Sequence, residues 1–114
     1  MREVVKVFKA LSDANRIRIL KMLEVRPLCV CEITRVINLA TSTISKHLSI
    51  LRDVDFIVGD KQGKWVTYSL NRDETSPYVQ KLLPLISEWL VDEKSVKQDQ
   101  EKVRSLSKEN LCEI

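Results

Sequence analysis

The spacing of apolar residues predicts a chain made mainly of short amphipathic helices. Residues 38–53 show this best, because Ile44, Leu48 and Leu51 recur at the i, i+4 and i+7 positions of one helix face. The opposite face is small, hydroxyl-rich and lightly basic. Such a face can approach a DNA groove closely, so that its hydroxyl and ammonium groups meet phosphates and base edges.

Further helices are expected on both sides of this one. They are residues 2–10, a helix begun by Ser12 and ended by Arg26-Pro27, residues 30–37, and a helix begun by Ser76-Pro77. In the second of them, Arg16, Arg18 and Lys21 are expected on the outer face. The two helices at 30–37 and 38–53 are joined by a tight turn, which predicts a helix-turn-helix.

Two β-prone runs follow the helix-turn-helix and flank residues 60–64. Val66, Tyr68 and Leu70 alternate with polar or exposed neighbours, which is the period of a strand with one buried face. The predicted fold is therefore mainly α with a β-hairpin. Lysines near the hairpin tip are placed to touch phosphate or reach into a minor groove.

The last predicted helix has a broader apolar face than a small domain needs. That face comprises Tyr78, Leu82, Leu85, Ile86, Trp89 and Leu90. It predicts packing against a second copy in a two-fold homodimer. Pro84 predicts a bend or a restart of this helix. Residues 1–94 are thus expected to form the folded domain, and residues 95–114, which mix both charges, a mobile tail.

The composition limits the classes of protein to which the chain can belong but does not select one. The chain has 114 residues, enough for one domain, and a formal charge of +3, which permits a nucleic-acid partner. No apolar run reaches the roughly 20 residues that span a bilayer, so we expect a cytoplasmic protein without a membrane partner. Thiols stay reduced in the cytoplasm. The cysteines are therefore interpreted as metal ligands, redox sensors or small apolar residues.

Four stretches resemble the ArsR/SmtB family of winged-helix metal-sensing repressors. They are Phe8–Leu23, Leu28–Ile33, Ser42–Ile57 and Gly63–Leu70, in the family's order and spacing. The resemblance implies a winged helix-turn-helix with flanking dimerisation helices. It also implies a homodimeric repressor, not an enzyme, that binds a partly palindromic double-stranded operator and releases it when a metal or metalloid binds. Ala40 stands where the family usually has a serine cap, so Thr41 is expected to cap the recognition helix.

The resemblance also implies which residues contact DNA. By position they are Thr41, Ser42, Thr43, Ser45, Lys46 and His47 in the recognition helix, and Lys61, Gln62 and Lys64 in the wing. His47 lies toward the buried side of the helical wheel. A lone histidine there is more often structural than a base reader or a ligand.

Cys29 and Cys31 lie at the start of the first helix of the helix-turn-helix. A helix N-terminus lowers a thiol pKa, and Arg26 and Arg35 are expected to help. Two thiols one residue apart on a helix do not share a face, so both can hold one ion only if the first turn loosens. A soft ion that prefers thiolates would then distort this helix and misplace the recognition helix.

The inducer depends on the ligand set. The resemblance implies arsenite or antimonite, which favour three thiolates, but Thr34 stands where the arsenic-sensing branch has its third cysteine. Cys112, from its own chain or the partner, or an exogenous group would complete the shell. Cadmium and lead rank lower, because that branch adds cysteines from an N-terminal extension absent here. Zinc ranks last, because its branch uses histidines in the last helix. No permanent cofactor is expected.

Three alternative hypotheses assign other roles to the cysteines, or none. Cys112 with Cys29 or Cys31 would make a redox or reactive-sulfur sensor of the same fold. A DNA-binding dimer that senses nothing would not need the cysteines. Cys29 and Arg35 also fit the C-x5-R spacing of phosphatase loops, but the residues between them include no glycine and one acidic residue, which would repel an oxyanion.

Overall fold

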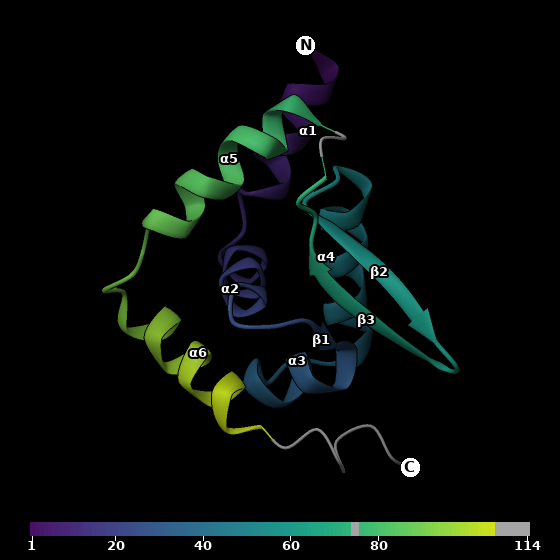
Figure 1. The fold of residues 1–114 in the computed structure, drawn as a ribbon, viewed down its shortest axis with the longest axis vertical. Coiled ribbons are helices and arrows are strands. Elements are labelled where there is room, and N and C mark those ends of the chain that lie inside the picture. The colour runs from purple at the N-terminus through teal and green to yellow at the C-terminus, as the bar shows by residue number, and fades with distance from the viewer. Residues whose placement is uncertain (74–75, 107–114) are drawn as a thin grey trace.

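A computed structural model describes residues 1–73 and 76–106 of the chain. The elements are α1 (Arg2–Ala10), α2 (Ala14–Leu23), β1 (Leu28–Cys29), α3 (Val30–Val36), α4 (Thr41–Asp53), β2 (Ile57–Gln62), β3 (Trp65–Leu70), α5 (Pro77–Glu88) and α6 (Lys94–Ser105). Helices α1 and α5 lie side by side at one end, the β2–β3 hairpin projects from one side, and α6 lies on the other (Figure 1). The predicted winged helix-turn-helix is confirmed, with α3 and α4 as its helices.

The wing is a three-stranded antiparallel sheet rather than a hairpin alone. Its strand order is β1-β3-β2, and Cys29 of β1 lies opposite Thr67 of β3. A two-residue strand has no readable period, so the sequence did not reveal β1. The β2–β3 turn depends on Gly63, whose φ of +65° is a conformation that glycine adopts without strain.

Helix α4 is held to the core as the apolar pattern predicts. Ile44, Leu48 and Leu51 are fully buried, in one hydrophobic cluster with side chains of α2 and α3. The helix begins at Thr41 with Ala40 as its N-cap residue, and no side chain caps it. The prediction that Thr41 caps this helix is therefore wrong, because Thr41 already has helical geometry as the first residue.

The cap of α2 lies one residue later than predicted. Asp13, not Ser12, is the N-cap residue, and its carboxylate accepts the N–H groups of Asn15 at 2.8 Å and Arg16 at 3.2 Å. Burial raises the pKa of Asp13, but these hydrogen bonds outweigh it and hold the pKa below its ordinary value. Ser12 instead donates its hydroxyl to the carbonyl of Phe8.

Replacing Asp13 with alanine is expected to lower the free energy of unfolding by about 1 kcal/mol at neutral pH. Asp13→Asn should cost only a few tenths, since asparagine caps nearly as well. The lowered pKa means that the carboxylate stabilises the fold above about pH 4 and that this contribution is lost as the pH falls through the folded-state pKa. Urea unfolding at pH 7 and pH 3 measures both effects. Equal pH dependence in wild type and Asp13→Asn would contradict this account.

Helix α6 replaces most of the expected mobile tail. Val96, Asp99 and Val103 are buried, and α6 packs on α2 and α3. The prediction of a mobile segment is therefore wrong for residues 95–106. The prediction failed because α6 has few apolar residues but places them on one face, where Val96 and Val103 are buried. The remainder of the predicted tail lies outside the described residues.

Two basic residues of α2 point inward because α6 and the end of α5 cover them. Arg18 Nε and Nη2 donate to the carboxylate of Asp99 at 2.7 and 2.9 Å. Lys21 is 1% exposed, donates to the carbonyl of Ile86 at 2.9 Å and forms an ion pair with Glu24 at 3.0 Å. The prediction that Arg18 and Lys21 stay outside is wrong, since Asp99 and the carbonyl of Ile86, which bind them, come from distant parts of the chain.

Helix α5 begins as predicted and leaves an apolar face uncovered. Ser76 accepts the N–H of Val79, and the helix runs through Pro84 without a restart. It ends at Glu88, and a positive φ at Leu90 turns the chain toward α6. Within the described residues, no helix is long and apolar enough to cross a membrane.

Candidate DNA interface and thiol site

The outer face of α4 is open to solvent along its first turns. The exposed residues there are Thr41, Ser42, Thr43, Ser45 and Lys46. They are short or flexible side chains on a helix whose opposite face is fixed in the core. This arrangement allows the backbone of α4 to approach a nucleic-acid groove closely.

His47 lies apart from these residues. It is half-buried, and its Nδ1 is 3.2 Å from Arg16 Nη1. Arg16 also donates to the carbonyls of Ala10 at 2.7 Å and Lys9 at 3.2 Å. These contacts tie α1, α2 and α4 together, so His47 belongs to the support of the recognition helix.

The wing residues lie on the projecting hairpin (Figure 1). Lys61 and Gln62 end β2, Lys64 lies in the turn, and all three are exposed. The ammonium of Lys64 is 5.5 Å from the centre of the Trp65 ring, within cation–π range. The wing therefore presents positive charge away from the body of the domain, where DNA phosphates can reach it.

The two cysteine sulfurs meet at the junction of β1 and α3. Cys29 Sγ is 3.1 Å from Cys31 Sγ. Cys29 is the N-cap residue and has an extended backbone, with φ −93° and ψ 169°, whereas Cys31 is helical. The prediction that the first helical turn must loosen before both thiols hold one ion is therefore wrong. It assumed that both residues are helical.

Burial and the neighbouring carboxylate of Glu32 determine the electrostatics of Cys29. Its carboxylate accepts the Cys29 N–H at 3.0 Å, and Arg26 Nη2 lies 3.0 Å from Glu32 Oε2 as an ion pair without hydrogen-bond alignment. Burial raises the pKa of the Cys29 thiol, and the Glu32 carboxylate raises it further. The predicted lowering of this pKa is therefore wrong. Arg26 pairs with Glu32 rather than with the thiol.

No third ligand joins the pair within residues 1–73 and 76–106. No group of three His, Cys, Asp or Glu residues there is placed to hold a metal ion. Thr34, at the position of the expected third ligand, donates its hydroxyl to the carbonyl of Cys31 at 2.8 Å. Cys112, the other predicted ligand, lies outside the described residues.

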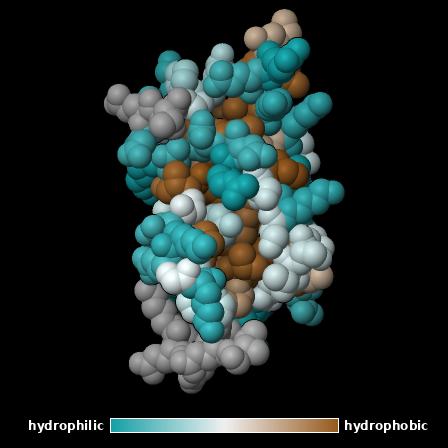
Figure 2. All heavy atoms as spheres, turned by 90° about the vertical axis from the view of Figure 1, so that its right-hand side faces the viewer, coloured by the Kyte–Doolittle hydropathy of each residue, from teal (hydrophilic) through white to brown (hydrophobic). Residues whose placement is uncertain are grey.

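A cavity of about 350 Å³ adjoins the cysteine pair. Its walls come from β1, the first turn of α3, Thr41 at the start of α4, and β3 with the turn before it. On the face that carries β2 and β3, hydrophobic residues gather toward the middle and hydrophilic residues surround them (Figure 2). The cavity therefore touches the thiols, the wing and the recognition helix at once.

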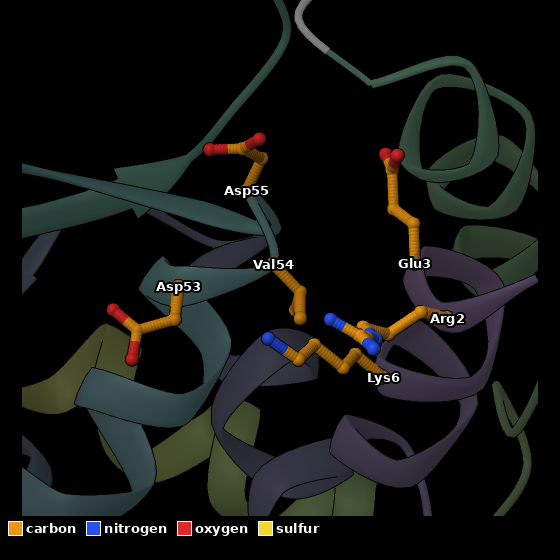
Figure 3. A pocket seen from close by; sticks show the side chains of 6 residues that line it. All are labelled: Arg2, Glu3, Lys6, Asp53, Val54 and Asp55. Atoms are coloured by element: carbon orange, nitrogen blue, oxygen red, sulfur yellow. The ribbon is translucent and has the colours of Figure 1, made fainter.

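A second hollow, between α1 and the end of α4, offers less chemistry (Figure 3). Its charged residues are Arg2, Glu3, Lys6, Asp53 and Asp55, and all are exposed. It contains both signs of charge and no thiol. Water can solvate each of these groups, so the hollow does not favour an ion of either sign.

The sequence analysis missed Glu32 and the aromatic neighbours of the thiols. Glu32 follows Cys29 by three residues, which is the spacing of a capping box and was a readable pattern. Trp65 and Tyr68 line the same cavity as the thiols because β1 pairs with β3. That pairing is a long-range contact, and the sequence carries no local sign of it.

Comparison with known proteins places these features in a family. The model of the family described as "Bacterial regulatory protein, arsR family" matches residues 13–58. The arsenical resistance operon repressor of Escherichia coli (strain K12) is 34% identical over 103 residues, which cover 90% of this chain and 80% of that protein. This chain belongs to the ArsR family.

Other members support the assignment. The cadmium resistance transcriptional regulatory protein CadC homolog of Staphylococcus aureus is 40% identical over 80 residues, 69% of this chain and 66% of that protein. HlyU from Vibrio cholerae N16961 matches in structure with a TM-score of 0.64 and 29% identity, covering 76% of this chain and 90% of that one. The chain is thus an ArsR-family transcriptional repressor rather than an enzyme. In keeping with this, the C-x5-R segment is helix α3 and not an anion-binding loop.

Proposed function

We propose that this ArsR-family protein leaves its operator when trivalent arsenic or antimony binds Cys29 and Cys31. The 3.1 Å separation of the two sulfurs carries this proposal. With metal–sulfur bonds of about 2.3 Å, as for zinc, two sulfur ligands of one ion lie no more than about 4.6 Å apart. The name of the E. coli relative, an arsenical resistance operon repressor, supports the same inducer class.

The position of the thiols supplies the coupling to DNA. Cys29 is paired with β3 of the wing, and Cys31 belongs to α3, which leads directly into α4. An ion that bridges both sulfurs binds one arrangement of wing and recognition helix better than another, and so shifts the population away from the DNA-binding form. By linkage, operator DNA must weaken ion binding by the same factor.

The proposal includes a homodimer that acts in the cytoplasm. Exposed apolar side chains gather on adjacent α1 and α5, among them Phe8 at 55% exposure and Leu85 at 44%. Trp89, at 49% exposure, extends this face beyond α5. A shared patch of this kind suits a two-fold interface, and a two-fold dimer matches a partly palindromic operator.

The wing is proposed to contact phosphates. Lys64→Ala is expected to weaken operator binding at all sequences alike and to reduce the slope of log affinity against log salt by about one. Fluorescence anisotropy at salt concentrations from about 50 to about 300 mM measures the operator affinity and gives this slope. Lys97→Ala, on α6 and far from the proposed interface, is the matched control. A slope unchanged by Lys64→Ala would remove the wing from the contacts.

The cysteines are tested by release from DNA. In excess reductant, Cys29→Ser and Cys31→Ser are expected to bind operator DNA as tightly as wild type does but to lose release by arsenite and antimonite. The reason is that serine keeps the shape of the residue but offers no soft ligand. Anisotropy titrations with arsenite, antimonite, cadmium, lead and zinc measure this, and we expect cadmium and lead to act more weakly and zinc least. Loss of DNA binding in both reduced variants would make the pair structural.

Cys112→Ser separates the remaining alternatives. Release by arsenite in this variant would mean that Cys29 and Cys31 suffice, whereas release in wild type alone would make Cys112 the third ligand. Release by an oxidant that needs Cys112, reverses with reductant and requires no ion would replace this proposal with a redox sensor. If neither an ion nor an oxidant releases the protein from operator DNA, the protein is a repressor that senses neither.

A further inference from the structure

A further cavity, which we call the α1–α4 cavity, lies between α1, the start of α2 and the end of α4. Its volume is about 280 Å³. It adjoins the second hollow (Figure 3) and shares Lys6, Asp53 and Val54 with it. Its other charged residues, Lys9 and Arg16, are both basic. Three cations and one carboxylate thus line this cavity, so it has an excess of positive charge that the second hollow lacks.

The walls of the α1–α4 cavity are mostly apolar. Ala10 is fully buried, and Ile50 and Val54 are half-buried against the hydrophobic core. The two lysines add hydrocarbon stems whose ammonium groups stay in water. The volume lies just below the roughly 300 Å³ at which drug-sized sites begin, so the cavity suits a small ligand. A ligand with an apolar body and one anionic group fits both the walls and the charge.

Arg16 is the cation of the cavity that the fold holds in place. Its Nε donates to the carbonyl of Ala10 at 2.7 Å, and its Nη2 donates to the carbonyl of Lys9 at 3.2 Å. Its Nη1 lies 3.2 Å from Nδ1 of His47 and 3.9 Å from the carboxylate of Asp13. A guanidinium has more N–H groups than these contacts use, so donors remain for a ligand. Its planar fork suits a carboxylate, which accepts two hydrogen bonds side by side.

The two lysines are available to the same ligand. In the part of the chain that the structure describes, neither Lys6 nor Lys9 forms an ion pair. Figure 3 shows Lys6 extending from α1 toward Val54. Asp53 lines the cavity as well, so a dianion such as phosphate meets more repulsion there than a monocarboxylate does.

We propose that the α1–α4 cavity binds a small apolar monocarboxylate, with its carboxylate on Arg16 and the lysines and its apolar body against Ile50 and Val54. The site uses no cysteine, so this inference goes beyond the proposed function and does not depend on it. The apolar face of α1 leaves the site open, because Phe8 lies two residues, or about 200° around the helix, from Lys6.

The place of the cavity on α4 couples its ligand to DNA. Ile50 lies one turn, about 6 Å along α4, beyond Lys46, which is one of the proposed DNA contacts. A bound carboxylate offsets positive charge there, and positive charge attracts DNA phosphates. The ligand therefore weakens operator binding, and operator DNA weakens ligand binding by the same factor. This coupling rests on the proposed DNA interface, whereas ligand binding does not.

The test uses benzoate as the probe on the full chain at constant ionic strength. Acetate, benzamide and inorganic phosphate are the comparison ligands, and the amide NMR shifts of the protein locate the site and give each dissociation constant. We expect benzoate to bind at least about tenfold more tightly than acetate, which lacks the apolar body. It should exceed benzamide by a similar factor, because benzamide lacks the charge. Phosphate that binds as tightly as benzoate would overturn the proposed ligand class.

Variants of the charged lining should change benzoate affinity in both directions. Lys6→Gln should weaken it about threefold, and Asp53→Asn, which removes the carboxylate of the cavity, should strengthen it about threefold. Arg16→Gln should weaken it about tenfold, but it also removes contacts between helices, so the two exposed positions decide the test. Lys94→Gln, exposed on α6, removes the same charge as Lys6→Gln and should change nothing.

The outcomes separate this inference from the proposed function. Benzoate that shifts no amides near Ala10, Ile50 and Val54, or binds Lys6→Gln and Asp53→Asn as it binds wild type, would overturn the site. Anisotropy with saturating benzoate should show operator affinity lowered about threefold, and no change there would overturn the coupling. Both results are obtained without arsenite, so the release experiments on the cysteine variants remain an independent test of the sensor.

Discussion

Replacing Arg18 with methionine is expected to lower the free energy of unfolding by about 3 kcal/mol. The substitution leaves the carboxylate of Asp99, which is 2% exposed, without the guanidinium that donates to it at 2.7 and 2.9 Å. A buried charge that loses its partner costs far more than the pair contributes in water. Because Arg18 and Asp99 join α2 to α6, we expect α6 to detach first.

Urea unfolding at fixed protein concentration measures this loss, and amide hydrogen exchange locates it in α6. The reverse change, Asp99→Leu, should cost less, since the side chain of Arg18 is 30% exposed and water can solvate it. The double variant Arg18→Met/Asp99→Leu should recover much of the stability, because it removes both charges. An additive double variant would contradict a coupled pair.

The Arg18–Asp99 pair is an example of a feature of the fold that could not be predicted from the sequence. Arg18 and Asp99 are 81 residues apart, and no local pattern in the sequence marks either of them as buried. A basic residue on an amphipathic helix is ordinarily solvated, so periodicity alone placed Arg18 and Lys21 outside. The predictions that succeeded depended on local chemistry, such as the apolar stripe of α4 and the Ser76 cap of α5.

At the thiol site, too, local features could be predicted from the sequence and long-range contacts could not. The sequence placed Cys29 and Cys31 correctly at the start of α3, because Pro27 and the apolar spacing are local features. Their mutual geometry depends on β1, which exists only through its pairing with β3. Once Cys29 is extended, the sulfurs meet at 3.1 Å, and no distortion of α3 is needed to bring them together. The mechanism that we propose is therefore an ion that bridges the wing and α3, rather than one that loosens the first turn of α3.

Leu48→Ala is expected to lower the free energy of unfolding by roughly 2–5 kcal/mol and to weaken operator binding with it. Leu48 is fully buried at the middle of α4, so the cavity left by its truncation loosens the helix that reads DNA.

The matched variant is Ser45→Ala on the exposed face of the same helix. It should leave the unfolding free energy within about 0.5 kcal/mol of wild type, because it touches no core residue. It should nevertheless weaken operator binding, since its hydroxyl faces the proposed groove contact. Urea unfolding and anisotropy on both variants separate the two roles. If Ser45→Ala bound the operator as wild type does, Ser45 would leave the set of DNA contacts, while Leu48 would still support the remaining residues from behind.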